Sequence, residues 1–326
     1  MINNIVIDKL TLCYSIKNPE ILAEIILGKE TDQPKEIEFD NDFKLYITKK
    51  KGFKSAYSIT YYDIVSDDMG EYKPQQYLFG VLKFGQIDGN EDDVEILNKK
   101  VWIDINNSTF YFRYNQESSK LVYLNYITER LGLQLNNLTH IDIAADSSVI
   151  NFAKTIKSLL RCEELVPIVV NKAYENRDKL IPHIQFIYST SCNKLLNDFS
   201  LYIQQRGNEN IVLNCYNKMN EIIDSSEKDY IAEYYNYPPR LHRLEIRLHR
   251  KQFHQFIEDN AIEFEDSLFH DTNFLTQIFE FHITKLIRFR KGKSGKDSMN
   301  IFDSLIWLEA KNRKIRTDKR RVKLNK

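Results

Sequence analysis

Three polar residues of complementary chemistry lie close together at the end of a strand-like run over 210–217. Tyr216 ends the apolar alternation, Lys218 follows two positions later, and Glu221 follows three positions after that. A tyrosine is a poor nucleophile near its ordinary pKa of about 10, so it needs help to lose its proton. Lys218 on the same face would favour the phenolate, and Glu221 or His140 could accept the proton. We therefore take Tyr216 as a candidate nucleophile, although a lone strand tyrosine is more often structural.

Two further strand-like segments carry carboxylates on one face, because side chains alternate between the faces of a strand. In the segment 241–249 the odd positions from 243 to 249 are polar, and in 138–148 the residues His140 and Asp142 oppose two isoleucines. If the three strands are neighbours, one sheet face gathers these residues: His140, Asp142, Tyr216, Lys218, Arg243, Glu245 and Arg247. Carboxylates on adjacent strands can hold a hard divalent cation, which polarises a phosphoryl oxygen. The product of tyrosine attack would be a phosphotyrosine that conserves the energy of the cut bond. A cross-strand ion pair is the alternative interpretation of a glutamate between two arginines.

The elements that must position these residues come in groups of strands rather than in strict alternation with helices. We expect strands over 43–50, 55–65, 77–85, 101–114, 138–148, 183–190, 199–206, 210–217 and 241–249. We expect helices over 120–132, 149–162 (capped by Ser147 or Ser148), most of 219–237, 250–260, 272–289 and 298–312. The pattern predicts an α+β fold: an antiparallel sheet with flanking helices, a helical C-terminal region and a basic tail. The expected parts are a strand-rich 1–130, a catalytic core over 131–260 and the helical region 261–326.

Composition and charge describe an ordinary water-soluble chain with a cationic end. The 326 residues are 42% hydrophobic and 28% charged, and no apolar run approaches the roughly 18 residues of a membrane span. The N-terminus lacks the pattern of a signal peptide, so we expect a cytoplasmic protein without a membrane partner. The four cysteines lack zinc spacing, which predicts free thiols. Of the 46 basic and 46 acidic residues, nine Lys or Arg and one Asp fall in 311–326, so a tail of +8 follows a body of −8.

A second basic stretch follows a long amphipathic segment at 286–297. Four of its cations are candidate DNA contacts: Arg288, Arg290, Lys291 and Lys293. The spacing of its glycines does not match the phosphate-binding loop of nucleotide-hydrolysing enzymes. We expect a phosphate-contacting loop that holds DNA together with the tail.

Two short motifs resemble those of a known family. The segment with Tyr216, Lys218 and Glu221 and the segment with Arg243, Glu245 and Arg247 resemble the Y-x-K-x-x-E and R-x-E-x-R pair of replication initiation factors. These are rolling-circle initiators of plasmids, related relaxases of conjugative elements and, more distantly, filamentous-phage initiators. The resemblance covers about 138–250, and this chain has His140 where members often place an arginine.

The resemblance implies a site-specific single-strand DNA endonuclease that joins its tyrosine to a 5′ phosphate with Mg²⁺ or Mn²⁺. It implies Tyr216 as the nucleophile, with Lys218 and Glu221 beside it, and Asp142 and Glu245 as metal ligands. Arg243 and Arg247 would contact DNA. The expected partner is origin DNA, single-stranded or supercoiled, and a host helicase and a second copy of the chain in a homodimer are further candidates.

Three alternatives remain beside this interpretation. Tyr230 and Tyr234 lie one helical turn apart, as in nicking enzymes that use two histidines around one apolar residue, but no H-x-H occurs in the chain. We expect those tyrosines to pack a helix or to stack on bases. The chain could also be a non-catalytic DNA-binding initiator or regulator, or a metal-dependent nuclease that uses water.

Overall fold

The structure of the chain is a computed structural model that describes most of its residues. These are residues 4–22, 36–38, 42–66, 70–86, 100–111, 120–176, 184–188, 199–204, 211–225, 228–292, 297–308 and 310–311. The predicted DNA contact Lys293 and the tail over 312–326 lie outside them.

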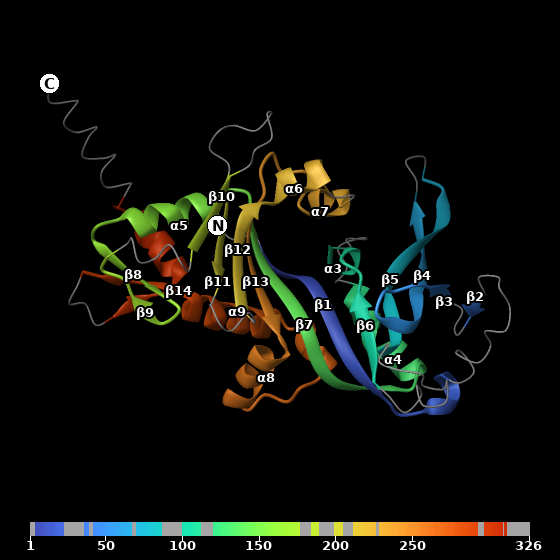
Figure 1. Cartoon of the computed structure of the whole chain (residues 1–326). Helices are drawn as coiled ribbons and strands as arrows, with labels where there is room; N and C mark the ends of the chain where they lie inside the picture. Colours follow the sequence, from blue (N-terminus) through green and yellow to red (C-terminus); the bar gives the residue numbers. More distant parts are fainter. Residues whose placement is uncertain are drawn as a thin grey trace, which may run out of the picture.

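A single antiparallel sheet of eleven strands forms the centre of the molecule (Figure 1). Its order is β10-β11-β12-β13-β7-β1-β6-β5-β4-β3-β2. The strands are β1 (Asn4–Ile16), β2 (Glu36–Glu38), β3 (Phe43–Thr48), β4 (Phe53–Ser66), β5 (Tyr72–Gln86), β6 (Val101–Ile105), β7 (Leu133–Ser147), β10 (Ile184–Tyr188), β11 (Phe199–Gln204), β12 (Ile211–Asn217) and β13 (His242–His249). With the helices around it, this sheet confirms the predicted α+β fold.

Strand β1 lies between β6 and β7 and pairs with both. One hydrogen-bonded sheet therefore runs across residue 130, where a boundary between the first two parts is expected. The division into three parts stays a prediction.

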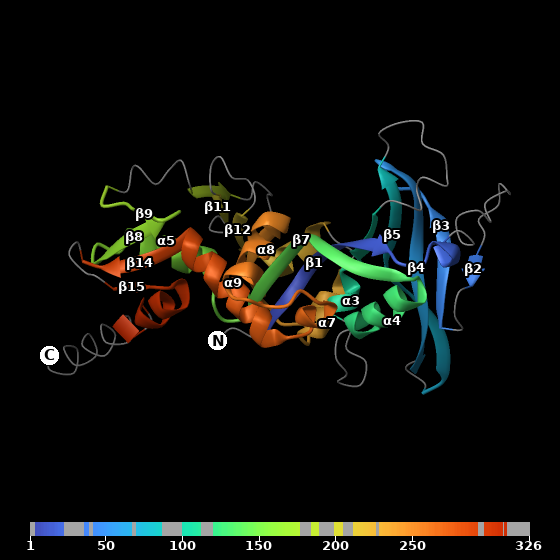
Figure 2. The same cartoon turned by 90° about the horizontal axis from the view of Figure 1, so that it is seen from below.

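Four further strands form a second, smaller sheet, and helices pack against the central one. The helices are α3 (Ser108–Tyr111), η1 (Lys120–Val122), α4 (Tyr123–Arg130), α5 (Phe152–Arg161), α6 (Lys218–Ser225), α7 (Asp229–Tyr234), α8 (Arg250–Asp259), η3 (Asp266–Phe269) and α9 (Thr272–Leu286). The second sheet has the order β15-β14-β8-β9, from β8 (Leu165–Val169), β9 (Lys172–Ala173), β14 (Ile287–Lys291) and β15 (Ser298–Met299). Figure 2 shows α8 and α9 lying along β7 and β1, with the second sheet beyond one end of α9.

The apolar face of the central strands lies in the core. Ile143 of β7, Leu213 of β12 and Ile246 of β13 pair in register and have no exposed surface. The amphipathic helix α9 packs against β1, β12 and β13 with a face that buries Phe279 and Ile283. Burial of such side chains stabilises the fold by about 1.5–3 kcal/mol each. The opposite face of the same strands is left for polar residues.

Three predicted boundaries are wrong for local reasons. The strand expected over 101–114 ends at Ile105, because the Asn106 side chain accepts hydrogen bonds from the N–H and hydroxyl of Ser108 and starts α3. Helix α5 is capped by Asn151 rather than by Ser147 or Ser148. The helix expected over 272–289 ends at Leu286.

The C-terminal segments divide differently from the expectation. After α9, residues 287–291 continue as strand β14, so the predicted phosphate-contacting loop begins as a sheet strand. The helix expected over 298–312 begins with the short strand β15, and residues 301–308 are helical.

Two further predictions concern the cysteines and membrane-spanning segments. Cys13, Cys162 and Cys215 are free thiols, and Cys192 lies outside the described residues. No helix in the described part of the chain is long and apolar enough to cross a membrane.

Candidate active site

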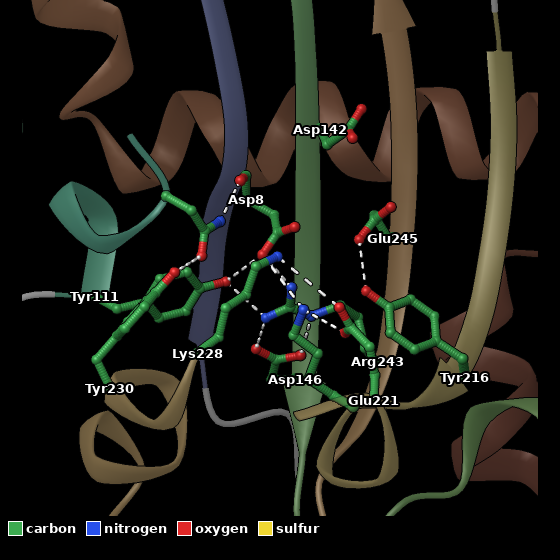
Figure 3. A network of polar contacts seen from close by, with 12 residues as sticks. Asp8, Tyr111, Asp142, Asp146, Tyr216, Glu221, Lys228, Tyr230, Arg243 and Glu245 are labelled. Atoms are coloured by element: carbon green, nitrogen blue, oxygen red, sulfur yellow. Dashed lines mark hydrogen bonds and ion pairs between the residues drawn. The ribbon is translucent and has the colours of Figure 1, made fainter. Parts of the chain in front are cut away.

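The three strands that carry the predicted polar face are neighbours in the order β12-β13-β7. Their register places Tyr216 beside Arg243 and Arg247 beside Asp142, with Glu245 between the two arginines on the same face. The alternation of each strand therefore brings the predicted residues onto one surface. Figure 3 looks onto this polar face, with a helix crossing behind the strands.

Tyr216 is hydrogen-bonded to Glu245. Its hydroxyl donates to Glu245 Oε2 over 3.0 Å. Burial, together with the nearby charge of Asp8, raises the pKa of Glu245 to about 7. Burial also raises the pKa of Tyr216 well above 10, and the Arg243 charge opposes that rise. Glu245 thus changes protonation state near neutral pH while it holds the phenol that it would have to deprotonate.

Asp142 is engaged on both oxygens. His140 Nε2 lies 2.7 Å from Oδ1, and Arg247 donates from Nε to Oδ1 and from Nη2 to Oδ2, each over 3.2 Å. Burial favours the neutral acid, but the hydrogen bonds from His140 and Arg247 outweigh it and lower the pKa of Asp142. The ring of His249 meets that of His140 edge-on, with 4.9 Å between the ring centroids. Asp142 is an ionised carboxylate with a half-exposed arginine above it.

Arg243 has no exposed surface and lies at the centre of a buried network. It donates to both oxygens of Asp146 over 2.7 and 2.6 Å, to Tyr111 Oη over 2.6 Å, and to Asp8. Burial opposes ionisation of Asp8, but the charges of Arg243 and Lys218 hold the pKa of Asp8 well below its ordinary value. Because the guanidinium is fully buried, Arg243 is not placed to make the DNA contact that is predicted for it.

Aromatic residues of α3 and α7 cover this end of the face. Tyr111 of α3 donates to Asp8 over 2.9 Å, and Tyr235, next to α7, donates to Asp146 over 2.8 Å. Tyr230 and Tyr234 pack against the ring of Tyr111 at centroid distances of 6.2 and 5.5 Å. Helix packing and base stacking are the two roles predicted for Tyr230 and Tyr234. The structure shows the first of them, since both rings pack against Tyr111.

Lys218 and Glu221 form a pair beside the tyrosine rather than at its hydroxyl. Lys218 Nζ lies 2.6 Å from Glu221 Oε2, 3.9 Å from Asp8 Oδ1 and 5.7 Å from the centre of the Tyr216 ring. Burial and the Arg243 charge lower the pKa of Lys218. Glu221 and His140 are the predicted acceptors of the phenol proton, but the structure places Glu245 at that hydroxyl.

Asp8 is the site residue that the sequence reasoning missed. It lies on β1, where the register with β7 shifts between Ile7 and Lys9, so a bulge interrupts the alternation. Figure 3 shows Asp8 on β1 pointing across β7 toward Arg243. The apolar alternation at the N-terminus would have predicted strand β1, but not the bulge that aims Asp8.

The predicted basic residues of 286–297 lie elsewhere. Arg288, Arg290 and Lys291 belong to β14 of the second sheet, to the left of the polar face in Figure 1. Arg288 donates to Asn171 Oδ1 over 2.9 Å and to the carbonyl of Thr284 over 3.1 Å. The structure does not bring these cations to Tyr216, and their role in holding DNA stays a prediction.

The predicted metal ligands are close but engaged. The register places Asp142 and Glu245 diagonally on adjacent strands, a separation of roughly 7–8 Å between backbones. Among the described residues, no three His, Cys, Asp or Glu side chains are grouped as a metal site. Two carboxylates on adjacent strands suit a hard cation in donor type, yet Arg247 and His140 already occupy Asp142. A cation here would require Arg247 to release Asp142.

Comparison with known proteins adds a structural likeness. Neither a family model nor a curated protein sequence matches the chain. A solved structure, a rolling circle replication initiator protein from Geobacillus stearothermophilus, aligns with 90% of this chain and 89% of its own. The sequences are 14% identical and the TM-score is 0.43. This likeness is too distant to assign a function to the chain. The chemistry of the polar face is the basis for the function proposed below.

Proposed function

We propose that this protein cuts and rejoins one strand of DNA through a covalent 5′-phosphotyrosine, as a rolling-circle replication initiator or relaxase. The observation that carries the proposal is the hydrogen bond from Tyr216 to Glu245, a carboxylate whose pKa is raised to about 7. A general base works best when its pKa lies near the working pH. The origin of a plasmid or other mobile element is the proposed substrate.

The proposed reaction uses groups on the polar face. Glu245 takes the phenolic proton as Tyr216 Oη attacks the phosphorus. A bond forms between Oη and phosphorus, the bond from phosphorus to the 3′ oxygen breaks, and that oxygen takes a proton from water. In rejoining, the 3′ hydroxyl gives its proton to hydroxide and attacks the phosphorus, the bond from phosphorus to Oη breaks, and the phenolate regains its proton from Glu245. The half-exposed Arg247 would hold the phosphate oxygens.

We also propose that the polar face binds a divalent cation. We propose Asp142 and Glu245 as ligands of Mg²⁺ or Mn²⁺, with Arg247 as a competitor for Asp142. A bound cation would offset charge on the phosphate oxygens. The other steps rest on Tyr216, Glu245 and Arg247.

Binding of Mn²⁺ to the protein without DNA tests this ligand pair. Arg247→Ala is expected to raise the affinity for Mn²⁺, because it frees the carboxylate of Asp142, and Asp142→Asn is expected to lower it. Titration calorimetry measures both. A higher affinity in Asp142→Asn than in the wild type would contradict the assignment.

The covalent product separates the proposed function from its alternatives. Supercoiled DNA of the cognate element, incubated with the wild-type protein and Mg²⁺, is expected to yield a nicked circle with protein attached on a denaturing gel. A nuclease that uses water gives nicks without attached protein. A binding module gives neither product. Either of those two results would contradict the proposal.

A further inference from the structure

An open groove of about 940 Å³ lies between the first half of β7 and helix α8. Strand β13 ends at His249 opposite His140, so beyond that pair β7 has α8 rather than β13 beside it. The groove is lined by polar residues: Asn136, Asn137, Thr139, His249, Arg250, Lys251, His254, Gln255, Glu258 and Asp259. Figure 1 shows α8 beside the lower part of β7.

The groove is continuous with the polar face. His249 lines it and meets the ring of His140, which in turn contacts Asp142. Arg247 lies two residues before His249 on the same face of β13. A polymer that passes Tyr216 and Arg247 and continues along β13 would therefore enter the groove at His249.

Exposed cations surround this entrance. Lys9 of β1, Arg250 and Lys251 are exposed, and within the described part of the chain none of the three forms an ion pair. Burial is the main cause that lowers the pKa of His249, and the charges of His140, Arg247 and Lys9 lower it further, while the charge of Asp142 opposes them. Glu258 and Asp259 line the same groove from the other end of α8. The entrance suits an anion, and the far end does not.

Neutral donors complete the entrance. His254 Nε2 accepts a hydrogen bond from the Leu138 N–H over 3.3 Å, so in the neutral ring the proton lies on Nδ1. The side chain of Thr139 adds a hydroxyl, whereas the amide of Asn136 donates to Ser15 Oγ and the amide of Asn137 donates to Asn136 Oδ1. Cations combined with neutral donors are the usual partners of a phosphate backbone.

We propose that this groove binds the phosphates of the single DNA strand that flanks the cut site, which rests on the proposed function of the polar face. From Glu245 to His249 is four strand residues, or about 13 Å. A stacked strand rises about 3.4 Å per nucleotide, so the first groove contact falls roughly four nucleotides from the scissile phosphate. The contacts are with phosphates, and the groove adds affinity without reading sequence.

The salt dependence of binding tests the proposal. Single-stranded oligonucleotides are bound to protein carrying Tyr216→Phe, which blocks cleavage, and fluorescence anisotropy is recorded from 50 to 300 mM salt. The double change Arg250→Gln with Lys251→Gln is expected to reduce the slope of log affinity against log salt by about 1.4, the value for two lost phosphate contacts. The matched control is Lys50→Gln with Lys51→Gln, two exposed lysines between β3 and β4 near the far edge of the sheet. An equal slope in the two double variants would overturn the proposal.

Oligonucleotide length gives a second readout. With wild-type residues in the groove, affinity is expected to rise when the strand is extended beyond about four nucleotides from the cut site on one side, and the groove variant should lose that gain. If the wild type forms no covalent adduct but the groove variant loses salt dependence, the groove stands and the proposed chemistry fails. If the adduct forms and the groove variant behaves as the control, the groove proposal fails and the proposed function stands.

Discussion

Replacement of Glu245 by glutamine is expected to lower the rate of DNA strand cleavage about 10²- to 10⁴-fold, the contribution of a positioned general base. The amide oxygen can still accept the Tyr216 hydrogen bond, but it cannot take the proton. The rate is measured with a supercoiled substrate at saturating Mg²⁺. Glu221→Gln is the matched control, because Glu221 is paired with Lys218 and should affect the rate much less.

The pH profile identifies the role of Glu245. Since its pKa is about 7, the wild-type rate is expected to rise with pH through neutrality and then level off, while Glu245→Gln should show no such rise. A cation bound to Glu245 would lower the pH at the midpoint of this rise. Rate profiles at several Mg²⁺ concentrations therefore distinguish Glu245 as a general base from Glu245 as a cation ligand. A wild-type profile that is flat between pH 5.5 and 8 at every Mg²⁺ concentration would contradict the role as base.

The same substitution has a stability signature that shows whether the variant is folded. The folded protein binds the Glu245 proton more tightly than the unfolded chain, because the folded pKa is about 7 and the ordinary pKa of a glutamate is 4.5. Through this group, the free energy of unfolding of the wild type falls as pH rises from about 4.5 to about 7. Glu245→Gln lacks that loss, so above pH 7 it should unfold no more readily than the wild type.

Replacement of Arg243 by methionine is expected to destabilise the protein by about 3–5 kcal/mol, the cost of removing one partner from a buried ion pair. The variant leaves Asp146, Asp8 and Tyr111 without the guanidinium that each contacts. Thermal unfolding should show a Tm lowered by roughly 10 °C. A neutral side chain of similar length still fills much of the space, so loss of the charge is the main change.

Arg247→Met is the matched control for Arg243 on the same strand and face. The Arg247 side chain is 47% exposed, and the buried Asp142 keeps its contact with His140, so we expect loss of this ion pair to cost about 1 kcal/mol. We expect Arg247→Met to unfold near the wild-type temperature and to bind DNA less tightly. We expect Arg243→Met to have a lower Tm and a DNA affinity that changes less. Equal Tm values for Arg243→Met and the wild type would contradict the central place given to the buried network.

The polar face could be predicted because strand alternation is a local property. Leu244 and Ile246 alternate with Arg243, Glu245 and Arg247, and only one pairing of faces buries the apolar set. The adjacency of β12, β13 and β7 was an assumption that the structure confirms. The Tyr216 and Glu245 pair then follows from register and side-chain reach.

The buried network and the bulge could not be predicted from that pattern. Alternation says that Arg243 faces away from the apolar core, but it does not say that α3 and α7 cover that end of the other face. Asp8 depends on a register shift in β1, which is a property of the β1–β7 pair and not of either segment alone. Local patterns specify which side a residue faces, and tertiary contacts decide whether water reaches it.

Mass spectrometry of the covalent product tests the central claim most directly. Wild-type protein that has cleaved a cognate oligonucleotide is digested with nuclease and protease, and the peptide that retains a nucleotide is sequenced. We expect a phosphodiester on Tyr216 and no adduct from Tyr216→Phe. An adduct on another residue such as Tyr230, or cleavage that survives in Tyr216→Phe, would contradict it.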